Sequence, residues 1–399
     1  MKVKAEMISK TSERAAPRRY FDWAATAATD PAAMRALIDS DFPFGNPSSA
    51  HREGRDAREA LEAARSRCAR VLGVPPQTVF FTSGGTEANC IPLYSTLARQ
   101  GSGRVLASLG EHSSVSENVK SLERLGRKTG SIAVDSAGRV TPALLSQALA
   151  KHPDARFAAI MSVNNETGTI SDIAALRDAL RSATAGRPHV HLHCDIAQAA
   201  GKIDVDLAGW DADSASLSAH KIGGPRGVGL LYLRKPLDAL CRGGGQEKKV
   251  RSGTENVAGA MALAACLESR ALPEKSGGDR EKARLRWKRL LGALKEIDRC
   301  RLIPEERGID DERFSPYIAQ IAFRDVPGEV MARALDDMGF AVSTGAACSS
   351  ASPERPVLAA MGVADGLSLE GIRVSQGWST TDEDIDGLLA AIAEVLKFL

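Results

Sequence analysis

The chain has 399 residues, more than one hydrophobic core usually organises, and at roughly 150 residues per domain this length predicts two or three domains. Hydrophobic residues make up 43% and charged residues 26%, and the formal net charge of +2, with both signs mixed along the chain, argues against a nucleic-acid partner. No apolar run reaches the roughly 18 to 20 residues that cross a bilayer and the N-terminus has no apolar signal core, so we expect a cytoplasmic protein without a membrane partner.

The cysteines and histidines give no sign of a metal site. The seven cysteines are scattered and contain no C-x-x-C pair, which indicates neither a disulfide framework nor a zinc site. The alternate histidines His189, His191 and His193 lack a carboxylate pattern, so we interpret them as structural. We therefore expect no bound metal.

The first nineteen residues differ from the rest of the chain. They are rich in lysine and arginine and poor in apolar residues, so we expect residues 1–19 to form a disordered or loosely held leader. A mitochondrial presequence would also be rich in arginine, but Glu6 and Glu13 argue against that reading.

From about residue 55 onward, helical and strand patterns alternate. Amphipathic periodicity predicts helices over 57–71, 143–150 and 173–182. Short apolar runs predict buried strands over 79–81, 104–107, 157–161, 190–193 and 214–217. This alternation is typical of an α/β domain with a mostly parallel sheet flanked by helices.

The polar, turn-forming segment 272–278 is the best candidate for a domain boundary. A charged helical run follows over 281–294, then a strand over 317–323 and helices over 329–338 and 382–399. We expect a large domain over 20–272, whose first residues could pack on the second domain, and a smaller α+β domain over 273–399.

Polar side chains follow five of the predicted strands, where the ligands of open α/β sheets bind. They are Thr82-Ser83-Gly84-Gly85-Thr86-Glu87, Glu111-His112, Asn164-Asn165-Glu166, Asp195 with Gln198, and His220-Lys221. Because the carboxyl ends of parallel strands share one edge, we expect these groups to lie together.

The glycine turn before Thr86 leads into a predicted helix. Glycines there would let backbone N–H groups close on a phosphate at the positive end of the helix, although a plain helix cap is a common alternative. Pro92, about six residues into this helix, is expected to kink or shorten it.

Lys221 follows an apolar run and precedes the turn Gly223-Gly224-Pro225. A desolvated lysine amine can attack a carbonyl, whereas an ordinary lysine is a solvated surface charge. The other polar residues that follow the strands favour a reactive Lys221. A pyridoxal phosphate site needs a lysine, an anionic partner for the ring nitrogen, a phosphate cup and a flat group over the ring. Lys221, Asp195, Gly85 with Thr86, and His112 are of the right types.

A series of motifs between Tyr20 and the C-terminal helix narrows this reading. They are Phe44-Gly45-Asn46-Pro47-Ser48-Ser49, Phe81-Thr82-Ser83-Gly84-Gly85-Thr86-Glu87, Glu111-His112, Val163-Asn164-Asn165-Glu166-Thr167-Gly168, His193-Cys194-Asp195-Ile196-Ala197-Gln198, Ser218-Ala219-His220-Lys221, Arg251-Ser252-Gly253-Thr254, Ser343-Thr344-Gly345-Ala346-Ala347-Cys348-Ser349 and Ile372-Arg373-Val374-Ser375. In order and spacing the chain resembles the class V aminotransferases, and within them the cysteine desulfurases of the NifS/IscS kind. The resemblance implies the pyridoxal-phosphate transferase fold of aspartate aminotransferase, with a seven-stranded sheet.

The resemblance also implies a role for each matching residue. Lys221 would hold pyridoxal 5'-phosphate, Asp195 would pair with its ring nitrogen, Gln198 would bond its phenolic oxygen and His112 would stack on the ring. Other roles fall on Gly85, Thr86, Ser218 and His220 for the phosphate, on Thr254 for the phosphate of the neighbouring subunit in a homodimer, and on Asn165 and Arg373 for the substrate carboxylate.

Cys348 lies among glycine, alanine and serine residues, a composition that favours movement over packing. In the family this cysteine takes the sulfur of L-cysteine as a persulfide, leaves L-alanine, and passes the sulfur to an acceptor or scaffold protein for iron–sulfur cluster or other sulfur biosynthesis. Trp23 and the pair Lys248-Lys249 depart from the usual family residues. The departure at Trp23 is expected to leave catalysis intact and to alter packing. Lys248 and Lys249 instead put in doubt how the neighbouring site or the acceptor is contacted.

Two other readings stay open at this point. A selenocysteine lyase or another class V aminotransferase-type enzyme would share the fold, although aminotransferases lack the loop cysteine. A catalytically silent partner in a sulfur-transfer assembly would be expected to lack Lys221 or Asp195, and both are present.

Overall fold

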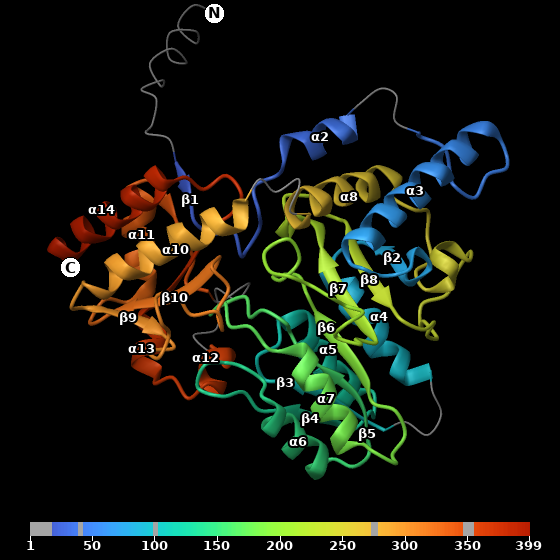
Figure 1. The fold of residues 1–399 in the computed structure, drawn as a ribbon, viewed down its shortest axis with the longest axis horizontal. Helices are drawn as coiled ribbons and strands as arrows, with labels where there is room; N and C mark the ends of the chain where they lie inside the picture. Colours follow the sequence, from blue (N-terminus) through green and yellow to red (C-terminus); the bar gives the residue numbers. More distant parts are fainter. Residues whose placement is uncertain (1–17, 39–42, 99–102, 273–277, 346–354) are drawn as a thin grey trace, which may run out of the picture.

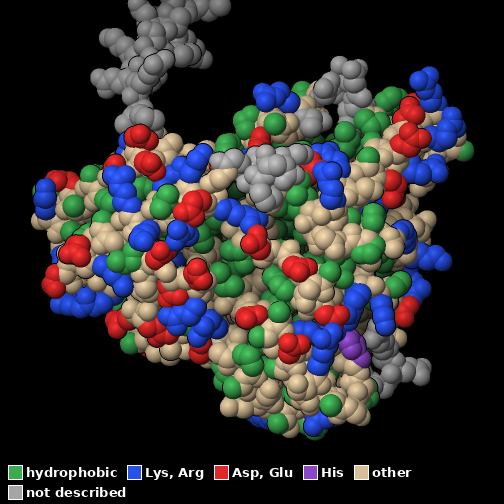
Figure 2. Space-filling model, in the orientation of Figure 1, with side chains coloured by type: hydrophobic (Ala, Val, Ile, Leu, Met, Phe, Trp, Pro, Cys, Tyr) green, Lys and Arg blue, Asp and Glu red, His purple; other side chains and the backbone are tan. Residues whose placement is uncertain are grey.

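The computed structural model describes residues 18–38, 43–98, 103–272, 278–345 and 355–399. These residues form two main hydrophobic cores, a larger one around a seven-stranded sheet and a smaller one around a three-stranded sheet (Figure 1). Among them, no helix is long and apolar enough to cross a membrane. Side chains of both charges are interspersed over the face in Figure 2, as the even charge distribution of the sequence predicts.

The large sheet has the strand order β2-β8-β7-β6-β5-β3-β4. Its strands are β2 (Val79–Thr82), β3 (Arg104–Ser108), β4 (Thr129–Ile132), β5 (Ala155–Ala159), β6 (His191–Asp195), β7 (Ser214–Ser218) and β8 (Gly229–Leu233). All neighbours pair in parallel except β8, which is antiparallel to both β2 and β7. The predicted α/β fold with a mostly parallel sheet is confirmed.

Two strands of this sheet were not predicted. β4 is an edge strand of sequence Thr-Gly-Ser-Ile with only its last residue buried, so it has no apolar pattern to detect. β8 is fully buried, but it follows β7 after a connection too short for a crossover helix, and the helix–strand alternation therefore did not reveal it.

Helices cover both faces of the sheet, as Figure 1 shows. The helices α3 (Arg52–Val71), α6 (Pro142–Lys151), α7 (Ile173–Ala183) and α8 (Val257–Ala271) contribute to the larger core together with Leu106 of β3. The helices α4 (Gly85–Ala98) and α5 (Ser113–Arg124) lie on the other face with Val105 and Ala107. The alternation along β3 is that of a strand buried on both sides. The short helix α2 (Pro31–Ile38) packs beside α8.

Pro92 does not shorten its helix. α4 runs unbroken over fourteen residues with Pro92 inside it. Pro92 is buried, and its carbonyl accepts a hydrogen bond from Ser95 Oγ at 2.7 Å. Burial on the sheet therefore offsets the roughly 3 kcal/mol that a proline in a helix interior costs.

The second core surrounds the antiparallel sheet β12-β10-β9, formed by β9 (Cys300–Ile303), β10 (Ile318–Phe323) and β12 (Gly371–Ser375). The helices α10 (Asp279–Lys295), α11 (Gly328–Asp337) and α14 (Asp382–Phe398) pack on it. The short helices α12 (Pro356–Ala360) and α13 (Asp365–Glu370) complete this part, and Val357 and Leu358 of α12 join the larger core.

The N-terminal stretch belongs to both cores. β1 (Arg19–Tyr20) pairs in parallel with β11 (Phe340–Ala341), and the fully buried Phe21 packs in the second core. The chain then crosses to the large sheet, where Ala27 N donates to His220 O at 2.8 Å and Asp30 N donates to Gly223 O at 2.8 Å. Residues 21–30 therefore reach the loop that follows β7. Of the expected leader, residues 1–17 lie outside the described residues.

Candidate active site

Lys221 ends a short 3-10 turn, η2 (Ala219–Lys221), directly after β7. Its Nζ donates hydrogen bonds to the backbone oxygens of Ala24 at 2.6 Å and Ala25 at 2.8 Å. The amine is therefore aimed by the N-terminal stretch that crosses between the two cores.

Asp195 is the last residue of β6 and is buried. Its Oδ1 accepts from the backbone N–H of Ala197 at 2.9 Å, and its Oδ2 accepts from Asn89 Nδ2 at 2.9 Å. Two N–H groups thus fix the carboxylate plane at the carboxyl edge of the sheet.

His112 caps the N-terminus of α5. Its Nδ1 accepts from the backbone N–H of Ser114 at 3.1 Å and lies 2.9 Å from Ser114 Oγ. Because a backbone N–H can only donate, Nδ1 is unprotonated and the neutral ring carries its proton on Nε2. Burial lowers the pKa of His112, while the charge of Asp195 opposes this and those of Lys221 and Arg373 add to it.

The turn into α4 has the form of a phosphate cradle. A Cβ placed on Gly85 would lie 3.3 Å from the Cβ of Ser218, the last residue of β7, and a Cβ on Gly229 would lie 2.5 Å from the backbone of Gly84. Thr86 is the second residue of α4. Because α4 begins at Gly85, three residues after β2 ends, the first turn of this fourteen-residue helix lies at the carboxyl end of the strand, where its N–H groups can bind an anion.

His220 lies between Ser218 and Lys221. Its Nδ1 is 3.1 Å from Thr26 Oγ1, and burial, together with the charges of Lys221 and Arg226, lowers its pKa to about 4. A neutral ring at this position can serve as a hydrogen-bond donor to an anion without adding a charge.

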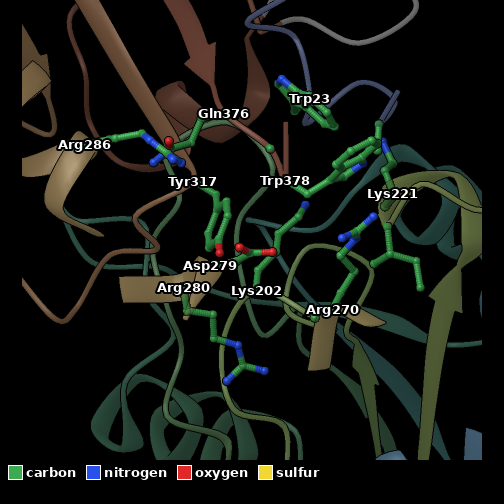
Figure 3. Close-up of a pocket in the computed structure, with 14 residues that line it drawn as sticks. Trp23, Lys202, Lys221, Arg270, Asp279, Arg280, Arg286, Tyr317, Gln376 and Trp378 are labelled. Atoms are coloured by element: carbon green, nitrogen blue, oxygen red, sulfur yellow. The ribbon is translucent and has the colours of Figure 1, made fainter. Parts of the chain in front are cut away.

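Gln198 and Lys202 form a second group beside Lys221. The Nε2 of Gln198 donates to Ala24 O at 2.8 Å, the same oxygen that Lys221 contacts, and its Oε1 accepts from Lys202 Nζ. Burial of the ammonium group lowers the pKa of Lys202 to about 7, although part of its side chain is exposed. Figure 3 shows Lys202 and Lys221 lining one pocket with Trp378 between the two cores.

The second core contributes Arg373, on β12, to the site. The Arg373 side chain is 2% exposed, with Nη1 donating to Asn165 O at 2.9 Å and Nη2 paired with Asp22 at 2.8 Å. Among the described residues, Arg373 Nε and Glu166 Oε2 have no hydrogen-bond partner. Burial raises the pKa of Glu166 to about 7, against the opposing charges of Arg373 and Arg355.

Two of the predicted site residues are not brought to this edge by the described structure. Thr254 is exposed on the segment between the 3-10 turn η3 (Gln246–Lys249) and α8. Cys348 lies outside the described residues.

Several residues of the site were missed by the sequence reasoning. Asn89 donates to Asp195 and to Ser114, and its Oδ1 contacts His193 Nε2 at 2.8 Å. The signal was present in part, since Asn89 lies one helical turn beyond Gly85 and His193 shares a strand face with Asp195. His193, interpreted as structural, is fully buried, and burial lowers its pKa to about 4.

The residues at this edge fit pyridoxal phosphate. The carboxylate of Asp195, fixed by two N–H groups, and the amine of Lys221 both act electrostatically on the imidazole of His112, and the glycine turn offers backbone N–H groups to a phosphate. The pairing of a lysine with an aspartate for the ring nitrogen is the pattern such enzymes use.

Comparison with known proteins gives a consistent family. Residues 19–388 match the family described as Aminotransferase class-V. A "NifS/IcsS protein homolog" of Lactobacillus delbrueckii subsp. bulgaricus is 36% identical over 95% of this chain and 97% of its own length. A "Cysteine desulfurase IscS" of Proteus mirabilis is 36% identical over 92% of this chain and 90% of its own length.

Solved structures agree with these sequence matches. A structure titled "NIFS-LIKE PROTEIN" is 32% identical with a TM-score of 0.85, over 96% of this chain and 100% of that one. A structure titled "Crystal structure of DndA from streptomyces lividans" is 32% identical with a TM-score of 0.72, over 88% and 98%. The chain belongs to the class V aminotransferase family, among the cysteine desulfurases of the NifS/IscS kind.

Proposed function

We propose that this protein is a pyridoxal-phosphate-dependent cysteine desulfurase that converts L-cysteine to L-alanine and holds the sulfur as a persulfide on Cys348. The observation that carries the proposal is the convergence of Lys221, Asp195 and His112 at one sheet edge beside the glycine turn of α4. Relatives that are more than a third identical over nearly the whole chain are named cysteine desulfurases, which supports the same activity.

Each residue at the edge has a task toward the cofactor. When bound, pyridoxal phosphate supplies an electron sink that weakens bonds at the substrate carbons. Lys221 provides the amine that holds it, Asp195 accepts from the ring nitrogen, His112 covers the ring and Gln198 donates to the phenolic oxygen. The phosphate is bound by Gly85, Thr86, Ser218 and His220.

Arg373 and Asn165 bind the substrate carboxylate in this proposal. The buried guanidinium pairs with the Asp22 carboxylate, and its Nε has no partner among the described residues. It is therefore suited to exchange Asp22 for the carboxylate of an incoming amino acid. Its position on β12 lets the second core take part in substrate binding.

The sulfur step is a nucleophilic displacement by Cys348. Its thiolate attacks the Sγ of the substrate, an S–S bond forms, the Cβ–Sγ bond breaks, and Cβ keeps the electron pair and takes a proton to become the methyl group of alanine. The sulfur leaves as a persulfide that a thiol of an acceptor or scaffold protein can receive, so no external oxidant is required.

The wider organisation is part of the same proposal. Residues 20–272 form the unit that binds the cofactor, and residues 273–399 form the unit that carries Cys348. The protein is a homodimer in which Thr254, exposed on its own subunit, reaches the phosphate in the neighbouring one. Six free cysteines among the described residues suit a reducing compartment and support a cytoplasmic location.

The test is to incubate the pyridoxal-phosphate-loaded protein with L-cysteine and a small thiol, and to measure alanine together with the mass of the Cys348 peptide. We expect alanine in step with turnover and a mass increase of one sulfur on that peptide before thiol is added. The Cys348→Ala variant should lose at least about 99% of alanine formation, since it lacks the nucleophile. Full alanine and sulfide production by this variant would contradict the mechanism, and such production from selenocysteine alone would assign the protein as a lyase for that substrate.

A further inference from the structure

Asn89 occupies an unusual position beneath the candidate active site. It lies on α4, its side chain is 0% exposed, and its partners come from three different elements. Nδ2 donates to Ser114 Oγ at 2.8 Å and to Asp195 Oδ2 at 2.9 Å. Oδ1 accepts from His193 Nε2 at 2.8 Å and from Ser216 Oγ. Both donors and both lone pairs of the amide are therefore in use.

The orientation of this amide is fixed by chemistry. An ionised carboxylate can only accept, so the Asn89 atom that faces Asp195 must be the nitrogen. Oδ1 then faces His193, whose Nε2 must donate, while His193 Nδ1 lies 2.7 Å from Ser214 Oγ. Because burial lowers the pKa of His193 to about 4, this ring stays neutral and the arrangement does not change near neutral pH.

The Asn89 amide also acts on His112, through the hydroxyl group of Ser114. Ser114 Oγ accepts from Asn89 Nδ2, so its single hydrogen is left for His112 Nδ1, 2.9 Å away. With the backbone N–H of Ser114 also donating to Nδ1, the neutral ring must keep its proton on Nε2. Asp195 and His112 are thus held by the same side chain.

We propose that Asn89 is a positioning residue of this active site, fixing the Asp195 carboxylate directly and directing the Ser114 hydroxyl as a second hydrogen-bond donor to His112 Nδ1. The inference rests on the proposed function, in which Asp195 meets the ring nitrogen and His112 covers the ring. Since α4 also begins with the glycine turn, Asn89 links the phosphate end of the cofactor site to its ring end.

Asn89→Leu tests the direct link, because leucine is close in size but has no polar atom and leaves Asp195 Oδ2 without its donor. Wild type and variant are titrated with pyridoxal phosphate and followed by visible absorbance over a range of pH. We expect at least about tenfold weaker binding, the effect of losing a hydrogen bond to a charged group. The pH dependence of the visible band should also change, which a purely structural residue would not cause.

Ser114→Ala tests the link to His112 and is a mild change in case Asn89→Leu folds poorly. Two donors to Nδ1 favour the neutral ring, so removing one should raise the pKa of His112 and move the acid limb of the rate–pH profile for alanine formation upward by about half a unit or more. The charged groups that act on His112, namely Asp195, Lys221 and Arg373, are unchanged in this variant.

The matched control is Ser95→Ala, on the same helix and also buried, which loses only the bond to the Pro92 carbonyl. It should leave cofactor affinity and both pH profiles as in wild type. Wild-type behaviour of Asn89→Leu and of Ser114→Ala would overturn the inference while leaving the proposed function intact. A wild-type protein that gains no visible band with pyridoxal phosphate would contradict the proposed function and this inference together.

Discussion

Glu111 is a carboxyl group that the fold keeps from ionising. It precedes His112, is buried, and accepts from the backbone N–H of Met161, while its Oε2 has no partner among the described residues. Burial, with a smaller effect of the neighbouring Asp195 charge, raises the pKa of Glu111 to about 8. At neutral pH, Asp195 therefore has a mostly neutral acid as its neighbour.

This pKa makes stability depend on pH in a defined direction. Between pH 4.5 and about 8 the folded state holds a proton on Glu111 that the unfolded state has released, so the free energy of unfolding falls as pH rises. Glu111→Gln removes this dependence. We expect its stability relative to wild type to increase by about 2 kcal/mol from pH 6 to pH 8 in urea unfolding. The exposed Glu123→Gln should show no such trend, and a parallel trend for both variants would refute the assignment.

The sequence predicts which residues lie at the site but not the hydrogen bonds between them. That polar groups after parallel strands share an edge follows from topology, and it predicts Asp195, His112 and Lys221 as neighbours. The role of Asn89 does not follow, because its partners lie 25, 104, 106 and 127 residues away along the chain and depend on how α4 sits on the sheet. The pairing of Lys202 with Gln198 required the three-dimensional arrangement in the same way.

Among the elements, the turn η3 combines a strained backbone with a buried ion pair. Glu247, Lys248 and Lys249 all have positive φ, between 44° and 70°. Glu247 is held by Arg65 through two hydrogen bonds of 2.7 and 2.8 Å and accepts from the backbone N–H of Phe81 at 2.9 Å. These contacts hold a left-handed conformation that ordinary residues rarely adopt.

Glu247→Gln is expected to destabilise the protein by about 3 kcal/mol, because it removes the buried carboxylate that pairs with the Arg65 charge. Glu62→Gln is the matched control: Glu62 also contacts Arg65, at 3.1 Å, but 54% of its side chain is exposed, so the expected loss is below about 1 kcal/mol. Urea unfolding of the two variants measures the difference. Equal losses would show that the turn does not depend on the buried pair.

The elements themselves were predicted unevenly, and the reasons are physical. Long amphipathic helices such as α7 and α14 agree with their predicted ranges to within a residue, because their periodicity extends over several turns. The edge strand β4 has almost no apolar pattern from which it could be predicted. At Pro92, tertiary packing outweighs the low helix propensity of proline, so the helix continues through it.

At the scale of the whole molecule, the proposed homodimer makes a prediction about mixed subunits. If each site combines Lys221 of one subunit with Thr254 of the other, a Lys221→Ala chain and a Thr254→Asp chain fail for different reasons. Each homodimer should be nearly inactive, the second because a carboxylate repels the phosphate. Co-expressed chains with different affinity tags should form heterodimers in which one of the two sites is intact.

Alanine formation by the purified heterodimer should therefore return to about half of the wild-type rate, as expected for one intact site of two. A mixture of separately folded homodimers, never allowed to exchange, is the control and should stay inactive. A heterodimer as inactive as its parents would place Thr254 in its own subunit's site, and a fully active Thr254→Asp homodimer would place it outside any site.

Because residues 19–30 contact both cores, the chain cannot be divided between residues 272 and 278 without separating parts of one core. A cut within residues 273–277 would leave Phe21 and β1 on the first fragment, while the hollow that receives Phe21 and the partner strand β11 would be on the second. We expect neither fragment to fold alone, because Phe21 belongs to the core of the second and Val357 and Leu358 belong to the core of the first. The two are complementary halves in the manner of a split reporter, and since Lys221 belongs to one and Arg373 to the other, their reassembly is expected to bring these two residues back to one site.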